Sequence, residues 1–236
     1  SRLSHELRTP IAVVRTSLEN LAMQQIPKNS INYIERAQSG IERLNLILTN
    51  MSEATRIEQM LHSTDKMPFN IYQVLTGCVK GYQQIYPNHE IHFSSNTASS
   101  NTVSSDSFSL KNTSAQVCGS PEHIAQLLDK VVTNAIEFTT DNKVHLTVKQ
   151  SNKNITIYIS NNGALLPEQM TERLFDSMVS IRGNSKDAIN NNRPHLGLGL
   201  YIARLICEFH QGSISATNHH NPQGVTIAVT LPLYNE

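Results

Sequence analysis

Three side chains near the start of the chain, His5, Glu6 and Thr9, have the types and the spacing that nucleophilic chemistry requires. A neutral imidazole is a nucleophile near neutral pH, and it attacks through one of its ring nitrogens. The carboxylate of the adjacent Glu6 is placed to hold the proton of the other nitrogen and to act as a general base. Thr9 follows His5 by four residues, so the two side chains share one face of a helix. The alternative is that this histidine is an exposed surface residue without a functional role.

Apolar spacing around these residues predicts a helix over residues 1–26 that presents His5 to solvent. The apolar positions recur every three to four residues, as in the seam of a helical bundle. They are Leu3, Leu7, Ile11, Val14, Leu18 and Leu21. Because successive residues turn by about 100°, His5 falls on nearly the opposite side of the helix from this stripe.

A second apolar stripe predicts another helix over residues 31–61. Its members are Ile34, Ala37, Ile41, Leu44, Leu48 and Met51. Residues 27–30 separate the two helices, with Ser30 as the expected N-cap, and so short a connection predicts an antiparallel hairpin. Two helices cannot enclose a core, so we expect the hairpin to join a second copy in a dimeric four-helix bundle. The alternative is that it packs on the rest of its own chain.

The helical periodicity breaks near residues 63–70, which predicts a hairpin domain at 1–62 and a second domain at 67–236. In the second domain we expect helices over 71–86, from Ser120 onward, over 167–175 and over 196–210. Expected strands cover 90–96, 116–120, 143–150, 154–161, 212–218 and 225–233. The polar stretches 97–114 and 179–195 are expected to be loops. This order of elements predicts an α+β sandwich with helices on one face of a sheet.

Composition excludes several classes of protein. Lys+Arg and Asp+Glu both number 19, so the formal net charge is zero, whereas nucleic-acid binders usually carry a basic excess. Three cysteines without a CxxC pair indicate reduced thiols rather than a zinc site or disulfides. No apolar run approaches the ~20 residues of a membrane span, and there is no signal peptide. The first residues read as the middle of a helix, so we expect a piece of a longer protein.

The heptapeptide from Ser4 to Pro10 resembles, residue for residue, the H-box of bacterial sensor histidine kinases. The resemblance implies that His5 accepts a phosphoryl group and passes it to an aspartate of a response regulator. It also implies that Thr9 positions water for removing phosphate from that regulator, and that Pro10 kinks the helix. It further implies the cytoplasmic portion of a bacterial inner-membrane sensor, which would reach the membrane only through segments preceding this sequence.

Residues 127–138 resemble the N-box of the GHKL ATPases, a fold that the resemblance extends over residues 67–236. Asn134 matches the asparagine that binds Mg²⁺, a hard ion that prefers oxygen ligands. Lys130 stands where the family often has another asparagine. Glu137 stands where a basic residue that contacts phosphate is common, and a carboxylate there would bind Mg²⁺ or a nearby base instead.

The remaining nucleotide motifs are degenerate. Asn161 occupies the position of the family's adenine-binding aspartate, where its amide oxygen can accept the same hydrogen bond without charge assistance. Gly163 is retained, whereas Leu165 replaces the second glycine. Phe175 matches the F-box and is expected to pack under an ATP lid formed by residues 179–195.

Two lid cations and a glycine box would contact the phosphates. Arg182 or Lys186 of the lid would reach the γ-phosphate, unless both are solvated loop charges. The motif from His195 to Leu200 resembles the second glycine box, with His195 in place of the first glycine. Gly197, Leu198 and Gly199 then lie where a helix begins, and free backbone N–H groups there bind phosphate. The sequence around the lid is similar to that of a proteobacterial subgroup that includes the Vibrio VxrA/VbrK-type kinases.

The resemblances together imply a protein-histidine kinase that uses ATP and Mg²⁺ and works as a homodimer with a cognate response regulator. Two rivals stay open. The departures at Lys130, Glu137, Asn161, Leu165 and His195 would suit a pseudokinase scaffold that only senses nucleotide. A kinase dominated by its phosphatase activity would depend mainly on Thr9. Other GHKL ATPases lack the helical hairpin with its H-box.

Overall fold

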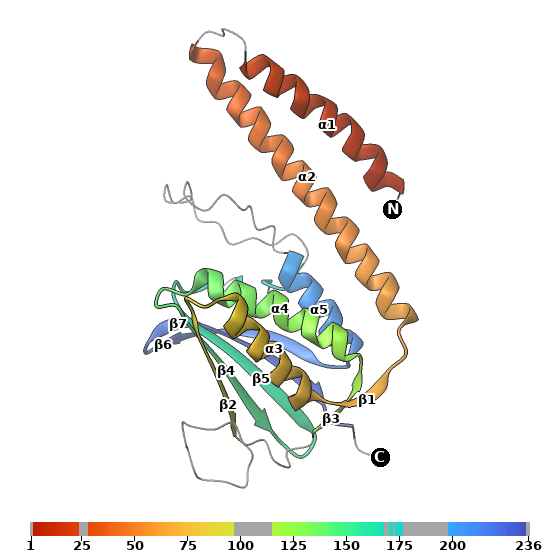
Figure 1. Ribbon diagram of the computed structural model, residues 1–236, viewed down its shortest axis with the longest axis vertical. Helices are drawn as coiled ribbons and strands as arrows, with labels where there is room; N and C mark the ends of the chain where they lie inside the picture. The colour runs from red at the N-terminus through yellow and green to blue at the C-terminus, as the bar shows by residue number, and fades with distance from the viewer. Residues whose placement is uncertain are drawn as a thin grey trace.

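The computed structural model describes residues 2–23, 28–96, 115–167, 170–171, 173–176 and 198–234. Helix α1 (Arg2–Ala22) and helix α2 (Lys28–Ser63) form an antiparallel hairpin, with α1 lying along the first part of α2 (Figure 1). Helix α2 begins at Lys28, so Ser30 lies inside the helix and its predicted role as N-cap is wrong. The helix starts directly after Pro27, the one residue of the connection that lacks a backbone N–H.

The apolar stripe of the hairpin is only partly covered within one chain. Ile34 and Ile41 of α2 are buried. Leu7, Val14 and Leu21 of α1 remain 40–48% exposed. Leu44 and Met51 of α2 are 50% and 45% exposed. Large apolar side chains at the seam positions therefore still face solvent in the single chain.

The rest of the chain forms one mixed sheet with a small ribbon beside it. Strands β1 (Met67–Asn70) and β3 (Gln116–Gly119) make the antiparallel ribbon. The main sheet has the order β2-β4-β5-β7-β6. Its strands are β2 (Glu90–Asn96), β4 (Lys143–Gln150), β5 (Asn154–Asn162), β6 (Ser213–His220) and β7 (Gln223–Pro232). Only β2 and β4 pair in parallel; the other neighbours are antiparallel.

Three helices cover one face of this sheet: α3 (Ile71–Ile85), α4 (Pro121–Phe138) and α5 (Leu198–Phe209) (Figure 1). The predicted α+β sandwich is therefore confirmed. Burial alternates along β5, because every second side chain points toward the helices. Helix α4 begins as its sequence predicts: the Ser120 hydroxyl accepts the N–H of His123 at 3.3 Å, and Pro121 occupies the first turn.

One expected helix of this domain differs from the structure, and two expected loops fall outside the described residues. The described residues between Pro167 and Asp176 form turns, so the helix predicted over 167–175 is wrong for them. A stretch this short gains little from helical hydrogen bonds unless an apolar face is buried, and here Leu174 and Phe175 are buried from a turn. The predicted loops 97–114 and 179–195 lie outside the described residues.

A buried histidine connects the start of α4 to the end of α5. His210 is 1% exposed, and its Nε2 accepts the N–H of Ser120 at 3.0 Å. Its Nδ1–H therefore donates to the carbonyl of Ile206 at 2.7 Å, which specifies the neutral tautomer. A Cβ atom on Gly119 would lie 2.0 Å from the ring, so only glycine fits there. Burial lowers the pKa of His210, because a charged ring would be poorly solvated.

This arrangement predicts an acid-dependent loss of stability. The pKa of His210 is lower in the folded chain than in the unfolded chain, so the unfolded chain binds a proton first as the pH falls. The stability contributed by the neutral ring is present above its ordinary pKa of about 6.5 and is lost as the pH falls below it. In thermal unfolding between about pH 7.5 and pH 5, Tm should fall less steeply for His210→Gln than for the parent.

The exposed His220 supplies the matched control, and His220→Gln should follow the parent curve. We also expect His210→Gln to lower the free energy of unfolding at neutral pH by about 1–3 kcal/mol, because a flexible amide replaces the rigid buried ring that bonds both Ser120 and Ile206. Parallel Tm curves for the parent and His210→Gln would contradict the assignment.

Candidate nucleotide-binding site

Helix α4 places Lys130 and Asn134 one turn apart on the same side. The Asn134 side-chain nitrogen donates to the backbone carbonyl of Lys130 at 2.9 Å. This bond engages the nitrogen of the amide and not its oxygen. Among the described residues no cluster of three or more His, Cys, Asp or Glu could hold a metal ion. The Asn134 amide oxygen is a hard ligand of the kind that could hold Mg²⁺ together with phosphate oxygens and water.

The ammonium group of Lys130 has a carboxylate partner from the hairpin. Its Nζ lies 3.0 Å from Oε1 of Glu53, which comes from α2. The two side chains are 27% and 38% exposed, so water partly screens the pair. Lys130 also lies beside the first turn of α5, because a Cβ atom on Gly199 would be 3.8 Å from the Lys130 Cδ. The ammonium group of Lys130 on α4 thus lies close to both the hairpin and the start of α5.

The end of β5 lies against the last turn of α4. Asn161 is 7% exposed, and its side-chain nitrogen makes a long contact of 3.4 Å with the carbonyl of Asn162. The next residue but one, Gly163, packs so closely that a Cβ atom would be 2.3 Å from the carbonyl oxygen of Phe138. Any other residue at Gly163 would push the strand end away from α4. The close backbone approach at Gly163 is thus made to the helix.

An amide side chain that the sequence analysis missed holds the segment after Gly163. Asn218 of β6 accepts the Leu166 N–H at 2.9 Å and donates to the Leu166 carbonyl at 2.8 Å. The sequence gives little indication of this contact, because Asn218 and Leu166 are 52 residues apart. The neighbouring Leu165, which replaces the family's second glycine, is half-buried. The strand exit is therefore fixed by Gly163 on one side and by Asn218 on the other.

Phe175 is buried at 4% exposure, as expected for an F-box phenylalanine. The adjacent Asp176 accepts a hydrogen bond at 2.9 Å from Arg204 of α5, and Arg204 also donates to Glu208 at 2.7 Å. These ion pairs connect the residues preceding the predicted lid to the outer face of α5. They are partly exposed, so they orient the segment more than they stabilise it.

Several predicted site residues lie outside what the structure describes. Arg182, Lys186, His195 and Gly197 are not among the described residues, and the side chains of His5, Glu6 and Leu198 are not described. Thr9 is exposed on α1. Glu137 is half-buried in the last turn of α4. The structure thus brings together Lys130, Asn134 and Gly199 and places Asn161 and Gly163 at the neighbouring strand end. His5, Glu6 and Thr9 belong to the separate hairpin.

The comparisons with known proteins match both parts of the chain. Residues 1–59 match the family model of the His Kinase A (phospho-acceptor) domain. Residues 119–235 match that of the histidine kinase-, DNA gyrase B-, and HSP90-like ATPases. The sensor protein DltS of Streptococcus agalactiae is 24% identical over 234 residues, which are 99% of this chain and 53% of DltS. The chain therefore spans about half the length of this curated relative.

Solved structures show the same fold. The complex of histidine kinase ThkA with response regulator TrrA matches with a TM-score of 0.58 and 22% identity, over 99% of this chain and 60% of that one. The Acinetobacter baumannii histidine kinase AdeS matches with a TM-score of 0.54 and 16% identity, over 98% of each chain. None of the helices among the described residues has the length and apolar character that crossing a membrane requires. The two family matches, a phosphoacceptor hairpin followed by an ATPase domain of the histidine kinase type, show that this chain belongs to the sensor histidine kinases of two-component systems.

Proposed function

We propose that this chain is the catalytic core of an ATP-dependent protein-histidine kinase that phosphorylates its own His5. The observation that supports this most is the position of Lys130 beside the first turn of α5, with Asn134 one turn further along the same helix. A cation, an amide side chain and a helix N-terminus then belong to one region of the domain, and each favours phosphate groups or the Mg²⁺ bound to them. Asn161, at the end of β5, is the proposed acceptor for the adenine amino group.

The proposed reaction is a phosphoryl transfer within the dimer. A ring nitrogen of His5 attacks the γ-phosphorus, the new P–N bond forms, and the bond to the β-phosphate oxygen breaks so that ADP leaves. Glu6 takes the proton from the other ring nitrogen. Mg²⁺, when bound, would neutralise charge on the phosphates. Lys130 and the start of α5 orient the triphosphate, and Arg182 from the lid segment is the proposed γ-phosphate contact.

The partners we propose follow from the hairpin. Apolar seam residues such as Val14 and Leu44, about half exposed in one chain, would be covered by a second copy in a four-helix bundle. The phosphoryl group would then pass to an aspartate of a response regulator. The likeness in fold to a histidine kinase that was solved in complex with its response regulator supports this proposal. We assign residues 1–62 to the dimerisation and phosphotransfer domain and 67–236 to the ATP-binding domain. We further propose that the chain is the cytoplasmic part of a membrane-bound sensor.

The resemblance to the Vibrio VxrA/VbrK-type kinases stays a prediction about the subgroup. Curated relatives that match the chain include sensor proteins of Streptococcus, Agrobacterium and Mycobacterium.

Labelled ATP should place acid-labile, alkali-stable phosphate on the protein, and His5→Ala should abolish the label, because no other residue supplies the nucleophile. His62→Ala, which changes an exposed histidine at the end of α2, serves as the control and should keep the label. Label that persists in His5→Ala would reject the assignment. A parent protein that binds nucleotide but takes up no label would instead favour the pseudokinase.

Removing the proposed metal ligand should weaken nucleotide binding when Mg²⁺ is present. We expect Asn134→Ala to weaken binding of a fluorescent ATP analogue by about tenfold or more when Mg²⁺ is present, since even the supporting partners of metal ligands matter by about 10–100-fold. With a chelator in place of Mg²⁺ the parent and the variant should bind alike. Asn32→Ala, on an exposed position of α2, is the control. An equal loss with and without Mg²⁺ would contradict the role of Asn134 as a ligand.

A further inference from the structure

The last turns of α2 dock on the helices of the ATP-binding domain. Ala54, Ile57 and Leu61 are 7%, 4% and 7% exposed and belong to the same core as α4 and α5. Their spacing of three and four residues puts them on one face of α2. Figure 1 shows this part of α2 running past α5, whereas the first part of α2 packs on α1. The same helix is therefore shared between the phosphoacceptor hairpin and the nucleotide-binding domain.

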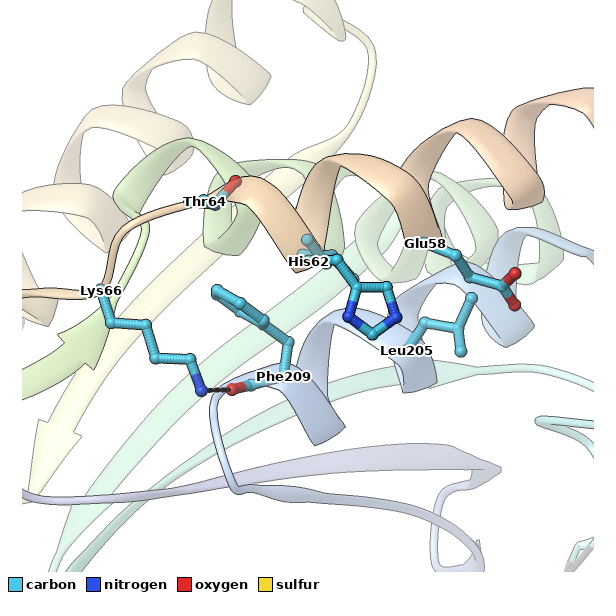
Figure 2. Close-up of a pocket in the computed structure, with 7 residues that line it drawn as sticks. Glu58, His62, Thr64, Lys66, Leu205 and Phe209 are labelled. Carbon is cyan, nitrogen blue, oxygen red and sulfur yellow. Dashed lines mark hydrogen bonds between the residues drawn. The ribbon is translucent and has the colours of Figure 1, made fainter.

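Polar contacts border this apolar strip at both ends. At the lower end, Lys66 Nζ donates to the carbonyl of Phe209, the last residue of α5, and lies 4.3 Å from the centre of its ring (Figure 2). In the middle, the Tyr201 hydroxyl donates to Glu58 at 3.2 Å. Burial and the Glu58 carboxylate raise the pKa of Tyr201, which keeps the hydroxyl protonated. At the upper end, Glu53 pairs with Lys130.

Packing along this contact is incomplete. A shallow pocket of about 420 Å³ remains between α2 and α5, lined by residues that include Glu58, His62, Lys66 and Leu205 (Figure 2). The contact therefore combines a narrow apolar strip with ion pairs and hydrogen bonds that are partly open to water, and small changes in charge can shift its strength.

Among the described residues, Glu53 and Lys130 form the polar contact of α2 that reaches the proposed nucleotide site. Lys130 is the single lysine or arginine of α4, and it stands one turn from Asn134 and beside Gly199. A triphosphate bound there would need the same ammonium that Glu53 now holds at 3.0 Å. The Glu53 carboxylate would also repel the phosphate oxygens, because like charges a few ångströms apart disfavour each other.

We infer that Glu53 and the phosphates of the nucleotide compete for Lys130, so that nucleotide binding and the docking of α2 oppose each other. This inference rests on the proposed ATP site and adds a device that regulates it. The coupling is reciprocal: a docked α2 weakens nucleotide binding by the same factor by which the nucleotide weakens docking. For a pair as exposed as this one, the expected factor is about two to five.

The test measures the Kd of a fluorescent ATP analogue with Mg²⁺ at low ionic strength on the whole chain. Glu53→Gln keeps the shape of the side chain and removes its charge, so it should tighten binding by about two- to fivefold. In a Lys130→Met background the same substitution should change nothing, because the contested ammonium is gone. Glu58→Gln is the matched control: it removes another carboxylate of α2 at the same interface, one that contacts Tyr201 instead of Lys130. Its Kd should stay close to that of the parent.

Each other outcome overturns the inference. Equal Kd values for the parent and Glu53→Gln would exclude the competition while leaving the ATP site intact. An equal gain in Glu58→Gln, or a gain that persists in Lys130→Met, would assign the effect to the docking of α2 as a whole. Absence of binding to both the parent and Glu53→Gln would overturn the competition together with the proposed function.

Discussion

The packing of the last turns of α2 on α4 and α5 is the contact on which the rest of the molecule depends. It is the main place where the hairpin that carries His5 meets the domain that would hold the nucleotide. Burial of a side chain such as Ile57 or Leu61 contributes about 1.5–3 kcal/mol, whereas a partly exposed ion pair such as Glu53–Lys130 contributes about 0–1 kcal/mol. The apolar strip therefore sets whether α2 docks. The ion pair makes the docked state responsive to a charged ligand.

The nucleotide motifs depart from the family pattern at positions where the structure supplies other support. Gly163 is retained because the carbonyl of Phe138 leaves no room for a side chain. Leu165 replaces the second glycine, and the chain beside it is held by the two hydrogen bonds between Asn218 and Leu166. Lys130 replaces an amide by an ammonium, which adds a charge that both Glu53 and phosphate can use. Degenerate motifs are thus compatible with an ordered site.

Periodicity and capping residues predicted most of the secondary structure. The stripe that includes Ile34 and Ile41 predicted α2, the expected strands 143–150 and 154–161 correspond to β4 and β5, and Ser120 with Pro121 located the start of α4. Local signals failed where tertiary contacts decide. Ser30 has the right type for an N-cap, yet the backbone is already helical at Lys28. The contact between Glu53 and Lys130, which are 77 residues apart, depends on how α2 docks. No motif in either helix predicts this contact.

The linkage between nucleotide and hairpin is tested most directly by hydrogen–deuterium exchange during a titration with Mg²⁺ and a non-hydrolysable ATP analogue. Peptides covering residues 127–138 of α4 and residues 51–61 of α2 report the two sides of the contact. We expect protection to rise in the α4 peptide and to fall in the α2 peptide over the same range of nucleotide concentration. Protection that rises in α4 while α2 is unchanged or also becomes more protected would contradict the opposition between nucleotide binding and docking.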